Sequence, residues 1–318
     1  MNNTVYCDIC QQSVPLCRIG AGFCGSVWAE EIGRGAIAIK REDGGPGRSL
    51  KNDSDVHQQL IDAQKTHRGQ FQIPNWYGYI QADDAADIVA RLPSGHLPSN
   101  ILLSERIPPM PLGVRRLLID KYCPPAAASS IADDPKNYDC LIRPYLGRRR
   151  RGFSKSAFRI FSLRNYPLHL DQIEDLGLNP YTYSERMAGA LAFMHWCGKI
   201  DANDVEFVLA PLSSQVSTPT ETIIPCPVLG DHCLWILDFD CCRPITMDEA
   251  GMEQAARAFW RNDPFYPRPG KEQESDVELW AHFKRAFLAA STKLIELHRQ
   301  KHLPELLLEL IESKSPLQ

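Results

Sequence analysis

Three short segments of this chain carry residue types that can hold phosphates and a divalent metal ion. A glycine turn contains Gly20, Gly22 and Gly25, one apolar strand pattern ends at Lys40, and another ends at Asp238. Glycines let backbone amides approach a phosphate closely because no Cβ stands in the way. A strand-borne lysine can bridge phosphate oxygens, and a strand-end aspartate can coordinate the metal ion. The order of these segments predicts nucleotide chemistry.

The glycine turn matches the pattern GxGxxGxV at every fixed position and ends at Val27. A dinucleotide-binding fold would place this pattern between a strand and a helix. Here the residues that follow, 26–29, have the pattern of a strand instead. The context therefore favours a strand–turn–strand hairpin whose three glycines, together with Val27, bind the cofactor.

Lys40 lies fifteen residues after Gly25, at the end of a nearly apolar stretch. An ammonium group in this position needs an acid on the next helix to hold it toward the phosphates. Asp53 and Asp55 open that helix, and we expect Asp53 to be the partner. The alternative is that either acid simply stabilises the helix N-terminus.

A second group of acids lies between a helical pattern and the apolar stretch 207–210. It contains Asp201, Asp204 and Glu206. Asp201 would orient an attacking hydroxyl or accept its proton, and Glu206 stands where a metal ligand is needed. The alternative is a solvated acidic turn.

The late strand end supplies two more acids. Asp238 would coordinate Mg²⁺ bridging the phosphates, and Asp240 would add a ligand directly or through water. Glu105 precedes the proline-rich stretch 107–112 and would lie where backbone groups meet an adenine. An ordinary strand-end acid is the alternative for Glu105.

The cysteines favour packed thiols over a zinc site. Eleven are scattered along the chain, which suits a reducing compartment better than a disulfide framework. Cys7 and Cys10 form one CxxC, but a structural zinc needs a second close pair or nearby histidines, and no second CxxC follows. Cys241 and Cys242 are interpreted as a strand-end pair.

Composition excludes several classes of partner. Charged residues make up 23% of the chain and the net charge is −4, so no global field attracts nucleic acid or an anionic membrane. No signal pattern opens the chain, and no run of about 18 apolar residues occurs. We therefore expect a cytoplasmic protein that acts on a small molecule.

Hydrophobic periodicity predicts an α+β protein with two lobes. The proline-rich stretch 107–112 separates a β-rich part, 1–108, from a mainly helical part, 109–318. A strand, a glycine turn and a second strand are predicted within 16–29, and further strands at 35–40, 73–80, 101–107, 138–146, 207–210 and 233–239. Helices are predicted at 50–67, 180–196, 247–260 and 277–301.

Taken together, these residues resemble the protein-kinase-like superfamily, in particular its small-molecule branch of choline kinases and aminoglycoside phosphotransferases. The stretches 195–209 and 262–269 also resemble the fungal DUF3669 family. The chain departs from the kinase pattern where His-Arg-Asp reads Lys199-Ile200-Asp201, where Glu206 replaces asparagine and where Asp240 replaces glycine. The resemblance implies a bilobal protein-kinase-like fold with a small β-rich N-lobe and a larger helical C-lobe.

The same resemblance implies an enzyme, an ATP- and Mg²⁺-dependent phosphotransferase acting on a metabolite hydroxyl or amine, with Mn²⁺ as a possible substitute. Lys40 and Asp201 would be its catalytic residues. One alternative is a pseudokinase-type regulatory or interaction module. Another is a kinase-like fold that performs ATP-dependent ligation or nucleotidyl transfer.

Overall fold

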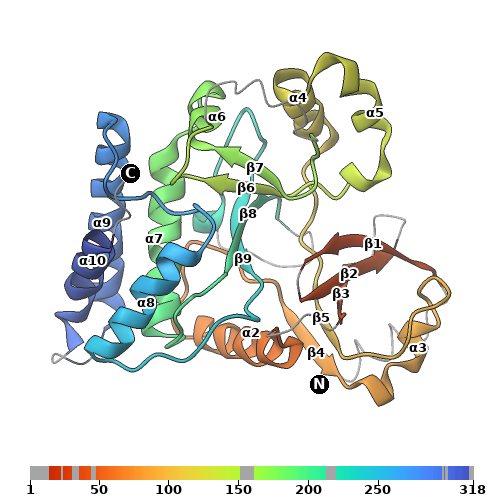
Figure 1. Cartoon of the computed structure of the whole chain (residues 1–318), viewed down its shortest axis with the longest axis horizontal. Coiled ribbons are helices and arrows are strands. Elements are labelled where there is room, and N and C mark those ends of the chain that lie inside the picture. The colour runs from red at the N-terminus through yellow and green to blue at the C-terminus, as the bar shows by residue number, and fades with distance from the viewer. Residues whose placement is uncertain are drawn as a thin grey trace.

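The structure is a computed structural model that describes residues 14–22, 24–30, 36–43, 48–150, 161–212, 220–295, 297 and 300–314. Two sheets and their covering helices make up a mixed α+β architecture (Figure 1). The predicted α+β class is therefore confirmed. The predicted CxxC at residues 7–10 lies outside the described residues.

The N-terminal sheet has five antiparallel strands in the order β1-β2-β3-β5-β4. An apolar cluster that includes Trp28, Ile39 and Leu103 holds the sheet against the short helix α3. These elements span β1 Leu16–Ala21, β2 Gly25–Glu30, β3 Ile37–Glu42, β4 Trp76–Ile80, α3 Ala86–Val89 and β5 Ile101–Glu105.

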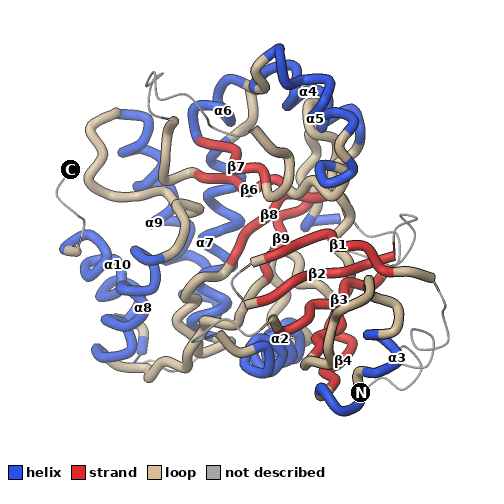
Figure 2. The backbone as a smooth tube through the Cα atoms, turned by 45° about the vertical axis from the view of Figure 1, so that its right-hand side comes forward, coloured by secondary structure: helices blue, strands red, loops and turns tan. Residues whose placement is uncertain are grey.

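Helix α2 (Leu50–Gln64) connects the N-terminal sheet to the rest of the chain. It begins where the Ser49 side chain accepts a hydrogen bond from the Asn52 amide, a normal N-cap. Leu50, Val56 and Leu60 are buried on its inner face. Figure 2 shows α2 below both sheets, between β4 and the base of α7. In this position α2 can contact residues of both sheets.

The C-terminal sheet has four strands in the order β7-β6-β8-β9. β6 and β7 are parallel, whereas β6–β8 and β8–β9 are antiparallel. The strands span β6 Ile142–Tyr145, β7 Tyr166–His169, β8 Glu206–Ala210 and β9 Cys233–Leu237. β7 was not predicted, because it is only four residues long and pairs across a long gap in sequence.

Helices cover the C-terminal sheet on the side away from the N-terminal sheet (Figure 1). Helix α7 is buried around most of its circumference, because it packs between the sheet and α9. The helices of this part span α4 Leu112–Tyr122, α5 Ala128–Asp133, α6 Leu170–Asp175, α7 Pro180–Trp196, α8 Glu249–Arg261, α9 Glu274–Leu294 and α10 Leu303–Ser313. The predicted helix 277–301 is thus too long at its C-terminal end. In the described part of the chain, none of the helices has the length and apolar character needed to cross a bilayer.

The proline-rich loop after α8 is a buried structural corner. Arg268 is only 7% exposed, and its guanidinium donates to the carbonyls of Phe259, Asn262 and Asp263. The same group lies over the rings of Phe259 and Trp260. Arg268 is therefore used inside the protein and does not face an anionic ligand.

Buried histidines make the stability of the fold depend on pH. His195 is 1% exposed and its Nδ1 donates to the Ile200 carbonyl at 2.9 Å. Burial lowers the pKa of His195, and also that of His169, to about 4. The unfolded chain, with a histidine pKa near 6.5, therefore takes up protons first as the pH falls.

We expect these two histidines to lower the free energy of unfolding as the pH falls from about 6.5 toward 4, each by up to about 1.4 kcal/mol per pH unit. Their contribution is fully present above pH 6.5. Urea unfolding of His195→Gln and of the wild type at several pH values measures the effect. The stability difference between the two proteins should shrink toward low pH, and a difference that does not change with pH would contradict this account.

Candidate metal and ligand site

A cavity of about 190 Å³ opens between the two sheets. Residues from β1, β2, β3 and β5 form one wall, and residues from β6, β8 and the end of β9 form the other. Nine of the residues predicted to bind a cofactor or metal line it: Gly20, Gly22, Gly25, Val27, Lys40, Asp53, Glu105, Glu206 and Asp238.

The glycines of the turn are explained by the packing of the hairpin strands more clearly than by ligand binding. A Cβ on Gly25 would lie 1.8 Å from the Arg41 carbonyl oxygen, so only glycine allows β2 and β3 to approach here. A Cβ on Gly20 would press on Val27 at 3.1 Å, whereas one on Gly22 would meet open space. Packing between strands therefore explains Gly20 and Gly25.

Lys40 is held between two carboxylates. Its Nζ lies 2.5 Å from Asp53 Oδ2 and 2.6 Å from Asp238 Oδ1, and its side chain is 15% exposed. Burial lowers the Lys40 pKa, but the charges of Asp238 and Asp53 outweigh burial and raise it well above its ordinary value. Asp55 instead pairs with Lys51 on the outer face of α2. The Lys40 charge is thus compensated inside the protein.

Helix α2 also fixes the loop that follows β9. Asp53 Oδ1 accepts a hydrogen bond from the Phe239 amide, and Asn52 Nδ2 donates to the carbonyls of Phe239, Asp240 and Cys242. Asp238 has a left-handed backbone with φ +67°, which costs energy for an aspartate. These hydrogen bonds hold the loop in that conformation.

The predicted catalytic acid Asp201 does not line the cavity. Its Oδ1 accepts from the amides of Asn203 and Arg243, and its Oδ2 accepts from Gln254 Nε2. Asp201 is 6% exposed. These bonds give it a role in holding two loops together, and its catalytic role stays a prediction.

Glu206 and Glu105 border the cavity in different ways. Burial raises the pKa of Glu206 to about 7, while its ion pair with Arg143 opposes that shift. Glu105 is buried, and its Oε2 accepts from both nitrogens of Asn75. Its carboxylate therefore holds the loop before β4.

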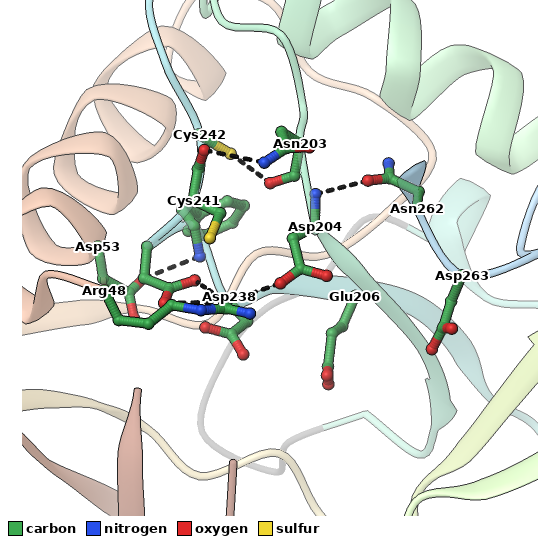
Figure 3. A network of polar contacts seen from close by, with 12 residues as sticks. Arg48, Asp53, Asn203, Asp204, Glu206, Asp238, Cys241, Cys242, Asn262 and Asp263 are labelled. Carbon is green, nitrogen blue, oxygen red and sulfur yellow. Dashed lines mark hydrogen bonds and ion pairs between the residues drawn. The ribbon is translucent and has the colours of Figure 1, made fainter. Parts of the chain in front are cut away.

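Asp204, Asp240 and Cys241 form a group of potential metal ligands beside the cavity. One ligand atom of each lies within 4.8 Å of the others. Asp240 has a fully buried side chain, whereas Asp204 is 45% exposed in its side chain. Figure 3 shows Asp204 and Cys241 approaching each other from two loops, close to Asp238. Asp204 is also left-handed, with φ +63°, and the Asn262 side chain accepts from its amide.

The guanidinium of Arg48 occupies the space between these carboxylates. Its Nη1 lies 2.6 Å from Asp204 Oδ2 and 3.0 Å from Asp240 Oδ1. A cationic side chain is drawn there because two close carboxylates create a strongly negative potential. The sequence pattern indicated Asp240 as a metal residue, but it gave no role to Arg48 and interpreted Cys241 as part of a strand-end pair rather than a metal site.

A comparison with family models finds one match. Residues 234–299, about a fifth of the chain, match the family DUF3669, described as "Zinc finger protein", and no kinase-like family matches. A search of curated proteins finds no match. The predicted membership of the protein-kinase-like superfamily is therefore wrong. So are the predicted phosphotransferase activity and its pseudokinase and ligase alternatives, because the matched family is described as a zinc finger protein family and no kinase-like family matches.

The prediction of ATP is wrong for the same reason, and the charge of the cavity also disfavours a bare triphosphate. Five acids line it, among them Asp53, Glu206 and Asp238, against the three bases Lys40, Arg106 and Arg143. The bases are already paired with Asp53, Asp139 and Glu206. A triphosphate would meet net negative charge there.

Mg²⁺ was wrong for a separate reason. Mg²⁺ prefers six oxygen ligands, including several waters, and a cysteine sulfur is not one of its usual ligands. A group that combines two carboxylates with the Cys241 thiol suits a softer ion such as Zn²⁺.

The described residues do not form a zinc finger of four cysteines and histidines. In the matched segment, Cys242 is fully buried and lies 3.6 Å from the Asn203 carbonyl, and His282 packs on the ring of Tyr181. Among the cysteines and histidines that the structure describes, Cys241 is the one that belongs to a group of potential metal ligands. The structure thus offers a mixed carboxylate and thiolate site.

Proposed function

We propose that this protein binds a divalent ion of the zinc type through Asp204, Asp240 and Cys241, and that the adjoining cavity binds a small molecule. The observation that carries the proposal is the convergence of three donor groups from two loops on one point that already attracts the cation of Arg48. The description of the matched family as a zinc finger protein supports the same class of function.

The chemistry of the donors fits zinc with one coordination position left open. Sites with three protein ligands commonly leave a fourth position to water or another ligand. Burial raises the pKa of the Cys241 thiol to about 11, so the thiol is protonated at neutral pH before a metal binds. An ion must displace that proton, and its affinity therefore rises with pH.

The adjoining cavity favours a neutral or cationic small molecule. Its excess of acids disfavours polyanions, and Ile19, Val27 and Leu237 supply apolar surface for the body of a ligand. Asp238 lies on the cavity wall two residues before Asp240, so a molecule bound in the cavity would lie close to the proposed ion. Chemical conversion of that molecule by the protein stays a prediction.

We also propose a two-lobed organisation, with residues 1–108 and 109–318 on either side of the cavity. The support is that the N-terminal sheet has its own apolar cluster, whereas the larger cluster lies almost entirely in the C-terminal part. Limited proteolysis should cut first near the proline-rich stretch 107–112 if the lobes move separately.

Calorimetric titration of metal-free protein tests the metal proposal. We expect one Zn²⁺ per chain and, at 100 times the dissociation constant, a stabilisation of about 2.7 kcal/mol. Mg²⁺ at the same concentration serves as the control and should have little effect. No binding of Zn²⁺, or equal binding of both ions, would contradict the proposal.

A further inference from the structure

Arg48 joins the two sides of the site across a long distance in sequence. It precedes the Ser49 N-cap of α2, whereas Asp204 and Asp240 belong to the loops before β8 and after β9. Its Nη1 also lies 3.1 Å from Asp240 Oδ2, so it contacts both oxygens of that carboxylate. Figure 3 shows Arg48 extending toward Asp204. This ion pair therefore ties the start of α2 to the C-terminal sheet.

A metal ion held by Asp204 and Asp240 would compete with the Arg48 guanidinium for the same carboxylate oxygens. The ion would need carboxylate oxygens of Asp204 and Asp240 at about 2.0–2.2 Å. A guanidinium that stayed within hydrogen-bonding distance of those oxygens would be repelled by the charge of the dication. The Arg48 side chain is 21% exposed, so it has a route toward solvent. The neighbouring contacts of α2, from Asn52 and Asp53, do not involve Asp204 and can persist.

We infer that Arg48 is a built-in competitor for the metal site: it neutralises Asp204 and Asp240 when the ion is absent and is displaced when the ion binds. This inference deepens the proposed function and depends on it. Metal binding then breaks the Arg48 ion pair that links the start of α2 to the C-terminal sheet. Occupancy of the metal site is thereby coupled to the backbone mobility of residues 48–50. The ion concentration at which this happens is set partly by Arg48.

Zinc titration against a chromophoric chelator tests the inference with Arg48→Gln. Removing the competing charge should tighten Zn²⁺ binding about tenfold or more, because a partly buried cation paired with two carboxylates must otherwise be displaced. Arg48→Lys keeps a charge and should stay closer to wild type. Arg257→Gln, on an exposed pair of α8, is the matched control and should not change the affinity.

Hydrogen exchange of the wild-type protein gives a second, independent readout. Zn²⁺ should speed amide exchange at residues 48–50, since the Arg48 tie is lost, while it slows exchange at residues 238–242. This measurement does not depend on a variant that must fold.

The possible outcomes separate the two proposals. Unchanged or weaker Zn²⁺ binding by Arg48→Gln, or slower exchange at 48–50, overturns the competitor role while the metal site stands. Absence of Zn²⁺ binding in wild type and in all variants overturns the proposed function itself.

Discussion

Replacing Lys40 by methionine should destabilise the protein by about 3–5 kcal/mol, because the substitution leaves the Asp53 and Asp238 carboxylates without their cation. Asp53 is 2% exposed and cannot recover its hydration. For a chain of this length, such a loss corresponds to a fall in melting temperature on the order of 10 °C. Thermal melting and urea unfolding of metal-free protein measure it.

Two comparisons identify the cause of that loss. Lys51→Met removes a lysine of α2 that is 58% exposed, and it should change stability by less than about 0.5 kcal/mol. Adding Asp53→Asn to Lys40→Met removes one uncompensated charge and should restore part of the stability. A Lys40→Met protein as stable as wild type would show that the ion pair does not hold the two sheets together.

Replacing Asp240 by asparagine should weaken Zn²⁺ binding on the order of 100-fold or more. Loss of a group that merely supports a ligand already costs 10–100-fold, and Asp240 is proposed as a ligand itself. Cys241→Ser should also weaken binding, because serine does not ionise near neutral pH. Equilibrium titration with Zn²⁺ measures both variants.

Controls for these variants come from similar residues outside the site. Asp55→Asn removes an exposed carboxylate of α2, and Cys226→Ser changes a thiol that accepts a hydrogen bond from the Leu229 amide. Both should bind Zn²⁺ like wild type. If Asp240→Asn binds equally well, the ion lies elsewhere, and the group of Asp204, Asp240 and Cys241 is not the site.

Local patterns predicted the elements that depend on local physics. The N-terminal hairpin, the helix that becomes α2 and the helix 180–196 follow from strand periodicity, capping and helical periodicity. The parallel pair β6–β7 could not be predicted in this way, because Tyr166–His169 finds its partner through tertiary packing alone. Helix α9 ends at Leu294 with an extended Ile295 after it, although the predicted helix continued to residue 301.

The sequence predicted several individual residues of the site, but it did not predict which of them contact one another. A lysine after an apolar strand and an acid opening the next helix suggested the neighbourhood of Lys40 and Asp53. Arg48 follows a glycine-rich stretch with no periodicity and meets Asp240 across 192 residues, so no local pattern indicates it. In the structure Lys40 pairs with Asp53, as expected, whereas its contact with Asp238, 198 residues away in sequence, could be seen only in three dimensions.

The most direct measurement of the metal site is X-ray absorption at the zinc edge on the protein loaded with one equivalent of Zn²⁺. The site described here predicts one sulfur at about 2.3 Å and two or three oxygen or nitrogen atoms at about 2.0–2.2 Å. In Cys241→Ser the sulfur contribution should disappear. A shell with two or more sulfurs, or one without sulfur in the wild type, would contradict the assignment of Asp204, Asp240 and Cys241 as the ligands.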